Sequence, residues 1–231
     1  MYYDLHIHSA LSPCGDDDMT LNNIVNMAFI KELELIAITD HNSVKQLKYL
    51  PKVAEGKIDF IYGVEIQSRE EVHILAYFLK DTDLDKVQSF LDKYLIEEPN
   101  DEDYFGHQYI LNDQDEIIGK EDRLLLKSVD LNIYEVVDAI HELHGIAVLA
   151  HANNKRYSIM SIYYEVPEDL DYDAIEVSRD YHKDQLIEMF PYLKDKVWLH
   201  SSDAHQLDAI SEPLYQIDEK TFYGLWEKRY G

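Results

Sequence analysis

The chain has very little cysteine and few basic residues for its 231-residue length. Cys14 is the only cysteine, so no intrachain disulfide can form, and we expect a cytoplasmic protein. Lysine and arginine total 21 against 46 aspartate and glutamate residues, which gives a net charge of −25. A surface that holds extended duplex nucleic acid is not expected, because neutralising phosphates requires clustered cations.

Long apolar segments and several familiar motifs are also missing. No run approaches the ~20 apolar residues of a membrane-spanning helix, and the N-terminus has no signal-peptide pattern. The chain contains no P-loop, no dinucleotide-binding fingerprint and no G-x-S-x-G elbow. Membrane insertion and the chemistries of these three motifs therefore find no support.

The length and the 46% apolar content predict a single globular domain over residues 1–231. Strand-like apolar runs alternate with helical patterns, such as the one that starts at Leu21 after the expected N-cap Thr20. The alternation favours an α/β fold with parallel strands, and the number of strands suits a seven-stranded β/α barrel. The expected strands are Tyr2–His8, Leu35–Thr39, Phe60–Ile66, Val72–Phe78, Ile146–His151, Ala174–Ser178 and Val197–Ser202.

Residues 97–128 interrupt the alternation. This acidic segment contains two strand-like runs, His107–Leu111 and Glu116–Ile118, around the turn-forming residues 112–115. We expect a small hairpin insertion beside the barrel. It could cover the site or select substrates, or it could be a surface excursion without a role in function.

Side chains that bind metals occur near the ends of these strands. In a strand, residues i and i+2 point to the same face, so His6 and His8 can hold one metal ion together, while Leu5 and Ile7 point toward covering helices. The catalytic residues of a β/α barrel gather at the C-terminal ends of its strands, so donors spread over 200 residues can converge on one pocket.

The middle strands contribute further donors. His41 follows the second strand as a ligand, beside Asp40, for which we favour orienting an imidazole over direct ligation or a helix N-terminal role. Glu65 lies in an apolar segment, where a carboxylate needs a partner, and a bridge between two ions would supply one. His73 is a candidate ligand, although a satisfied core histidine would show the same pattern.

The last strands end in the same kind of residue. His151 closes the fifth strand, and Asp203 and His205 follow the seventh. Asp203 alternates in phase with Ser201, whereas His200 points to the opposite face and is not expected to be a ligand.

The loop after the first histidine pair offers one further donor. We select Asp16 for a third metal position, with the alternative that Asp16, Asp17 and Asp18 only precede the helix that Thr20 caps. Cys14 could also be a ligand, but we interpret it as a buried, inert thiol.

Two cations near strand ends could bind a phosphate. Arg156 follows the fifth strand and Arg179 the sixth, and a planar guanidinium binds phosphate through two parallel hydrogen bonds. Surface ion pairs are the alternative for each of them.

The remaining histidines carry no such pattern. His141 and His144 are spaced i, i+3 rather than the i, i+4 of a zinc-protease helix, and His107 and His182 are isolated.

The ordered set resembles the PHP (polymerase and histidinol phosphatase) family over residues 1 to about 210. The matching pieces are His6-Ile7-His8, Thr39-Asp40-His41, Gly63-Val64-Glu65, His73, Ala150-His151 and Ser202-Asp203-Ala204-His205. The resemblance implies a distorted seven-stranded TIM-like barrel, two or three divalent ions (Zn, Mn or Fe) and phosphoester hydrolysis by a stand-alone member. Family members often place a histidine or an aspartate shortly after the first pair, where this chain has the Cys14–Asp18 loop.

We therefore expect a metal-dependent phosphoesterase in which a metal-activated hydroxide attacks phosphorus. His205 or His151 would protonate the leaving group, and Arg179 or Arg156 would stabilise the phosphoryl charge. Expected substrates are a small phosphomonoester, a nucleotide or a short oligonucleotide end. The alternatives are a metal-dependent amidohydrolase that cuts C–N bonds and a non-catalytic metal-binding module.

Overall fold

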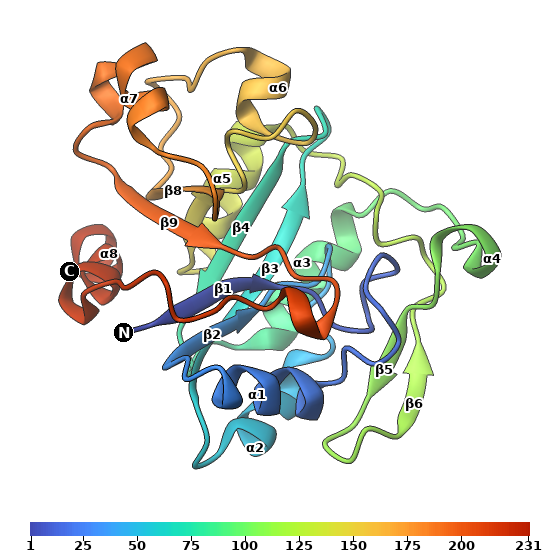
Figure 1. Ribbon diagram of the computed structural model, residues 1–231. Coiled ribbons are helices and arrows are strands. Elements are labelled where there is room, and N and C mark those ends of the chain that lie inside the picture. The colour runs from blue at the N-terminus through green and yellow to red at the C-terminus, as the bar shows by residue number, and fades with distance from the viewer.

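Seven strands form one sheet that curls into a barrel (Figure 1). The computed structural model describes residues 1–231. The strands follow one another around the sheet in the order β1-β2-β3-β4-β7-β8-β9. This confirms the distorted seven-stranded barrel expected from the sequence. The strand bounds are β1 Tyr3–Ile7, β2 Leu35–Ile38, β3 Asp59–Gln67, β4 His73–Phe78, β7 Ile146–Leu149, β8 Ala174–Ser178 and β9 Val197–Ser201.

Backbone hydrogen bonds bring the two edges of the sheet together. The His8 amide donates to the Ala204 carbonyl at 2.9 Å, and the Ala204 amide donates to the His6 carbonyl at 3.2 Å. These bonds join the chain after β9 to β1 and nearly close the barrel. They also place the last candidate metal-binding segment beside the first.

One strand departs from the expected parallel arrangement. β4 pairs antiparallel with both β3 and β7, whereas the other neighbouring pairs are parallel. No helix separates β3 from β4, and a tight turn at residues 68–72 connects them. His73 therefore lies at the start of its strand and still reaches the rim where the parallel strands end.

A register shift in β1 corrects the expected direction of Leu5. The pairing with β2 skips a residue between Asp4 and Ile7, so a bulge interrupts the alternation of side chains. Leu5 consequently packs in the barrel interior, while Ile7 packs toward the covering helices as expected.

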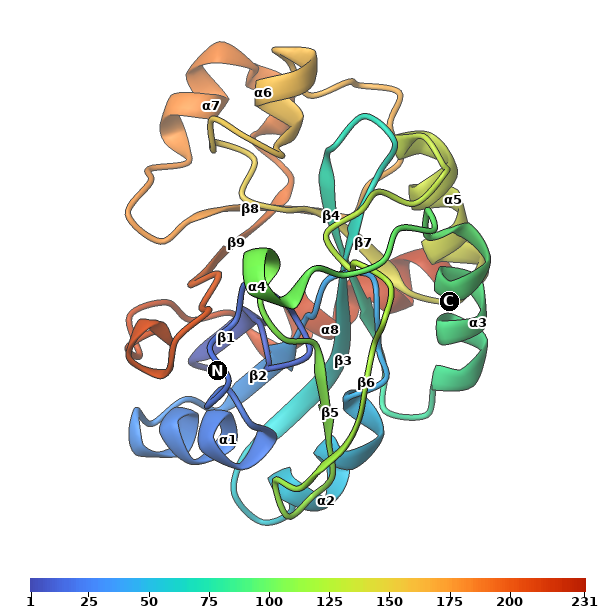
Figure 2. The same ribbon diagram turned by 90° about the vertical axis from the view of Figure 1, so that its right-hand side faces the viewer.

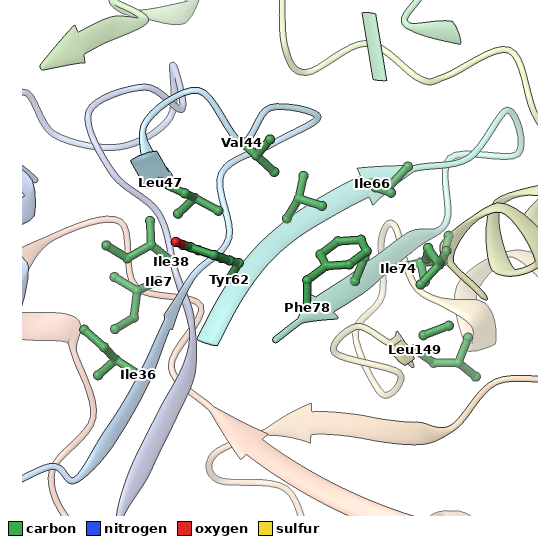
Figure 3. Close-up of a cluster of buried hydrophobic side chains, with 14 of the residues drawn as sticks. Ile7, Ile36, Ile38, Val44, Leu47, Tyr62, Ile66, Ile74, Phe78 and Leu149 are labelled. Atoms are coloured by element: carbon green, nitrogen blue, oxygen red, sulfur yellow. The ribbon is translucent and has the colours of Figure 1, made fainter. Parts of the chain in front are cut away.

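Two apolar layers hold the barrel. The larger one lies between the sheet and the helices around it, and Figure 3 shows part of it, with Tyr62 and Phe78 beside aliphatic side chains. The smaller one fills the barrel interior and packs Leu5 and Tyr77 against Phe222 and Trp226 of α8. The helices are α1 Leu21–Ile30, α2 Leu50–Ala54, α3 Leu84–Tyr94, α4 Glu102–Phe105, α5 Ile133–Glu142, α6 Ile159–Tyr163, α7 Asp184–Met189 and α8 Glu219–Tyr230, with single 3-10 turns at Leu47–Tyr49, Pro191–Leu193 and Leu207–Ala209.

Local signals account for the helix starts. The Thr20 hydroxyl accepts a hydrogen bond from the Asn23 amide, which confirms the expected N-cap of α1. Asn132 and Glu135 form a reciprocal capping box at the start of α5. None of the helices combines the length and the apolar character that crossing a membrane requires.

The expected hairpin insertion is present. β5 (Tyr109–Leu111) and β6 (Ile117–Lys120) pair antiparallel and lie to one side of the barrel in Figure 1, which is the side that faces the viewer in Figure 2. The Tyr109 amide donates to the Ala10 carbonyl at 2.9 Å, and the Asn42 side-chain amide donates to the carbonyls of Leu125 and Lys127, each at 2.8 Å. The insertion is thus fastened to the loops that follow β1 and β2.

Candidate metal centre

The predicted donors meet at one rim of the barrel. Their segments follow β1, β2, β7 and β9, begin β4, or lie near the end of β3. The donor atoms form three sets, and within each set all the donor atoms lie within 4.8 Å of one another. The sets are His8, Cys14, His41 and His205; His6, His8 and Asp203; and His41, Glu65 and His73.

Glu65 occupies the middle of the centre. Its Oε1 lies 2.9 Å from His73 Nδ1, 3.1 Å from His151 Nε2 and 3.3 Å from His6 Nε2. Its Oε2 lies 3.1 Å from His41 Nδ1 and 3.5 Å from His8 Nε2. Five imidazoles thus surround one buried carboxylate and divide between its two oxygens.

Asp203 is the second carboxylate of the centre. Its Oδ1 lies 3.2 Å from His8 Nε2 and 3.3 Å from His6 Nε2. The two Nε2 atoms are 3.2 Å apart, so His6 and His8 present their nitrogens to the same point.

Fixed partners orient the imidazoles of β1. His6 Nδ1 lies 3.0 Å from Glu176, a buried carboxylate on β8. His8 Nδ1 lies 3.0 Å from the Ser12 hydroxyl, which itself donates to Asp40 at 2.7 Å. Asp40 thus acts on His8 through Ser12 rather than directly. In both rings the bonded Nδ1 leaves Nε2 free to face the centre, as in metal-ligating histidines.

The same arrangement recurs on the other side of the centre. His73 Nε2 lies 3.0 Å from Gln67 Oε1, so its Nδ1 faces Glu65. His205 Nδ1 lies 2.8 Å from the Asp203 carbonyl oxygen, and an amide-type acceptor of this kind requires the ring N–H on Nδ1. Nε2 of His205 is therefore the free donor atom.

The protonation states of Glu65, Asp203 and His205 suit metal binding. Burial opposes ionisation of Glu65, yet the surrounding imidazoles hold the pKa of its carboxyl well below the ordinary value. Burial also opposes ionisation of Asp203, and His6 and His8 outweigh it and lower that pKa too. Burial lowers the pKa of His205 to about 4, so this imidazole is neutral at pH 7. Ionised carboxylates beside a neutral imidazole are the forms that bind cations.

Two buried imidazole atoms have no hydrogen-bond partner. Nδ1 of His41 and Nδ1 of His151 are both buried and make no hydrogen bond, although His41 Nδ1 lies 3.1 Å from Glu65 Oε2. A buried polar atom without a partner is costly, and a ligand bound at the centre would supply a partner for such a nitrogen. Nitrogen and oxygen donors at this density therefore fit divalent first-row metals.

The backbone is strained at two of the donor segments. His151 has φ 28° and Asp203 has φ 54°, conformations that residues other than glycine adopt rarely. Such conformations cost about 1–3 kcal/mol each and concentrate at functional sites.

A pocket of ≈ 520 Å³ opens onto the centre. The segment Asn154–Tyr157 forms one wall, and Leu126 of the insertion belongs to the lining as well. Tyr157 stacks on His73 with ring centroids 4.9 Å apart. Lys155 and Arg156 are the only lysine and arginine among the lining residues, so a single segment supplies the basic side chains of the pocket. A larger groove of ≈ 1010 Å³ at the other end of the barrel, beside Phe29 and Lys57, holds none of the three donor sets.

Two expected site residues lie elsewhere. Asp16 is exposed and belongs neither to the donor sets nor to the pocket lining, whereas Cys14 belongs to both. Cys14 is also exposed rather than buried, contrary to our expectation. Arg179 is exposed and donates to the Ala209 carbonyl at 3.3 Å. The strand ends at Ser178, one residue before Arg179, so the side-chain alternation of β8 does not direct Arg179 into the pocket.

Glu176 is the residue of the centre that our sequence reasoning missed. It lies 2% exposed in the apolar run Ala174–Ser178, and it accepts a hydrogen bond from the His151 amide at 3.0 Å as well as contacting His6. The signal was available, since the argument applied to Glu65 holds equally for this carboxylate.

The histidines that were set aside lie outside the centre. His107 pairs with Asp17, His141 pairs with Asp173, and His200 stacks on Tyr215. None of them belongs to the three donor sets.

Comparison with known proteins gives a family and a fold. A family model of the PHP domain matches residues 4–212. No curated protein matches the sequence. A chain from Bifidobacterium adolescentis, to which a metal-dependent phosphoesterase activity is ascribed, is 17% identical with a TM-score of 0.67, and the match covers 96% of this chain and 94% of that one.

Two further solved structures share the fold. The lesion-specific endonuclease Q from Pyrococcus furiosus is 21% identical with a TM-score of 0.63, covering 90% of this chain. This chain spans 49% of that endonuclease, about half its length. An amidohydrolase from Chromobacterium violaceum, solved with sulfate and without metal, is 16% identical with a TM-score of 0.63, covering 99% of this chain and 97% of that one.

Proposed function

The chain belongs to the PHP domain family, and on that premise we propose that it hydrolyses phosphoesters with the help of bound divalent metal ions. The observation that carries the proposal is the position of Glu65. Its two carboxylate oxygens face different groups of imidazoles within 3.5 Å, which is the arrangement expected of a carboxylate shared by two cations.

The residues of the centre have two roles in this proposal. His6, His8, Glu65 and Asp203 hold the cations, with His41, His73 and His205 completing the donor sets. Divalent ions, when bound, lower the pKa of a coordinated water and neutralise negative charge on phosphoryl oxygens. Glu176, Ser12 and Gln67 keep the imidazoles in the orientation that cation binding needs.

Lys155 and Arg156, which line the same pocket, bind the phosphoryl oxygens. A guanidinium and an ammonium beside the donor cluster stabilise charge that develops on these oxygens during transfer. Arg179 takes no part in this proposal because its side chain lies outside the pocket.

His151 donates the proton to the leaving group. It lines the pocket, but it belongs to none of the three compact donor sets, whereas His205 does. An imidazole that is not committed to a cation can carry a proton to the leaving oxygen.

A small phosphorylated molecule is the substrate class that we propose. The pocket has a volume of ≈ 520 Å³ and only two basic side chains, and the net charge of −25 repels a long polyanion. A nucleotide or the end of a short oligonucleotide meets the same requirements. Recognition of a DNA duplex is said only of endonuclease Q, which is about twice as long as this chain.

A phosphate-release assay tests the proposal. The purified chain, reconstituted separately with Zn²⁺, Mn²⁺ and Fe²⁺, is supplied with p-nitrophenyl phosphate, nucleoside monophosphates and 5′-phosphorylated oligonucleotides. We expect metal-dependent release that Glu65→Gln abolishes and that the exposed-residue control Glu227→Gln leaves unchanged. Hydrolysis of a small cyclic amide without phosphate release would favour the amidohydrolase alternative, whose fold this chain shares.

A further inference from the structure

Cys14 belongs to a donor set whose other three members are imidazoles. Its Sγ lies within 4.8 Å of donor atoms of His8, His41 and His205, and the side chain lines the pocket. No hydrogen bond of the thiol is present, and the residue is exposed. A single cysteine carries little information by itself, so its surroundings decide.

His41 is an independent sign of a ligand at this point. It is 5% exposed, its ring nitrogens make no hydrogen bond, and its Nδ1 is completely buried. The imidazoles of His6, His8, His73 and His205 all have a fixed partner on one nitrogen. A buried imidazole without one is under-satisfied, and a cation bound at the ring would satisfy it.

The other two imidazoles present free nitrogens to the same place. The rings of His8 and His205 are stacked with centroids 4.3 Å apart, and Nδ1 of each is bonded away from the centre. His8 Nε2 lies 3.2 Å from Asp203 Oδ1, which assigns His8 to the His6 and Asp203 set. His41 Nδ1 lies 3.1 Å from Glu65 Oε2, but Glu65 has four further imidazoles around it, so His41 is not needed to hold that carboxylate and is available to the cation at the thiol.

The loop presents the thiol rather than its acidic neighbours. The Gly15 amide donates to the Ser12 carbonyl at 2.9 Å, so Cys14 is one of the two central residues of a tight turn. A Cβ on Gly15 would lie 2.7 Å from the Ser9 carbonyl oxygen, which keeps this position free of a side chain. The Asp16 amide then donates to the His205 carbonyl at 2.9 Å, and the carboxylates of Asp16, Asp17 and Asp18 lie on exposed residues.

We propose that Cys14 is a thiolate ligand of a further cation, held together with His41 and His205. The thiol gives its proton to solvent as the sulfur–metal bond forms. Three protein donors leave one coordination position for water or substrate, as in catalytic zinc sites. The inference depends on the metal-dependent function proposed above, but it concerns one ligand and not the reaction.

A thiolate changes which metal the site prefers. Soft sulfur donors favour zinc and iron over magnesium, calcium and manganese, whereas an aspartate at this place would favour the harder ions. Zn²⁺ is therefore the cation that we expect at Cys14, while the Glu65 sites, built from nitrogen and oxygen donors, accept a wider range.

X-ray absorption at the zinc edge tests the ligand directly. The complete chain, purified under reducing conditions and loaded with Zn²⁺, should show a sulfur shell at about 2.3 Å beside nitrogen and oxygen at about 2.0–2.1 Å. Cys14→Ser removes the only cysteine, and its spectrum should lose that shell. A wild-type spectrum that contains only nitrogen and oxygen neighbours would overturn the proposal, and this measurement needs no variant.

Metal counting by elemental analysis provides the matched comparison. Cys14→Ser should lose one zinc ion per chain relative to wild type, and Asp16→Asn should keep the full number. Full stoichiometry in Cys14→Ser, or loss in Asp16→Asn alone, would contradict the assignment. Phosphate release is measured separately. A sulfur shell without phosphate release would contradict only the proposed function. Phosphate release without a sulfur shell would contradict only the assignment of Cys14 as a ligand.

Discussion

At one end of the barrel α8 covers an apolar interior that includes Leu5, Tyr77 and Phe222, whereas at the other end Glu65 and Asp203 lie among imidazoles. The same strands build both ends. Burying an apolar side chain contributes about 1.5–3 kcal/mol to stability, while a buried charge without a partner destabilises the fold. The covered end supplies stability, and the rim retains polar groups that only a ligand can fully satisfy.

The largest expected effect sharpens the functional side of this contrast. Glu65→Gln removes the charge that five imidazoles surround, so it should reduce metal content and lower kcat/KM by about 10³-fold or more. Elemental analysis and steady-state kinetics measure the two effects. Glu227→Gln, at an exposed position of α8, serves as the control. Wild-type metal content in Glu65→Gln would show that Glu65 does not hold cations.

The covered end should respond in the opposite manner. Phe222→Ala leaves a cavity beneath the barrel and should lower the free energy of unfolding by roughly 3–5 kcal/mol, measured by urea denaturation. Metal content of the folded protein should not change, because Phe222 contacts no donor. The half-exposed Phe29→Ala, at 57% exposure, should cost far less. A loss of metal from folded Phe222→Ala would show that the two ends are coupled.

Glu176→Gln tests a residue that positions rather than binds. The amide can still accept a hydrogen bond from His6 Nδ1, but it lacks the charge that increases the basicity of the ring. Metal affinity should fall about 10- to 100-fold, measured by titration against a competing chelator, with the fold retained. The exposed Glu188→Gln is the control. Unchanged metal affinity in Glu176→Gln would show that the charge of Glu176 does not contribute to metal binding.

The smallest expected effect concerns the basic wall of the pocket. Arg156→Ala should raise KM for a phosphomonoester by about tenfold and change kcat less, because the guanidinium contacts substrate oxygens and no metal donor. Metal content should stay at the wild-type value. Arg69→Ala, which removes an exposed ion pair with Asp130, provides the comparison. Equal KM values for the two variants would show that Arg156 does not bind the substrate.

Strand positions were predictable because their signal is local. Apolar runs and alternation lie within a few residues of each other, and all seven expected strands overlap those observed. The direction of β4 was missed, although the interval between Ile66 and Val72 is too short for a parallel crossover, which needs about a dozen residues or more. The length of this loop therefore predicts the antiparallel direction of β4, which the alternation of strands and helices does not.

The candidate site was predictable in its residue types and less so in its details. Glu65 and Glu176 show the same pattern, a carboxylate in an apolar strand, and only the first was selected. Arg179 was chosen from its position just after a strand, and Asp16 from its loop just after the first histidine pair. The end of β8 and the turn at Cys14 place them outside the pocket.

The sequence by itself determined which segments become strands and which residue types stand near their ends, because apolar periodicity and side-chain chemistry are properties of neighbouring residues. Only the tertiary structure decided which oxygen of Glu65 faces which imidazole, which nitrogen of each ring is free, and whether a thiol or a carboxylate completes a donor set. These depend on contacts between residues far apart in the sequence, such as His6 and Asp203, and no local pattern encodes a distance in space.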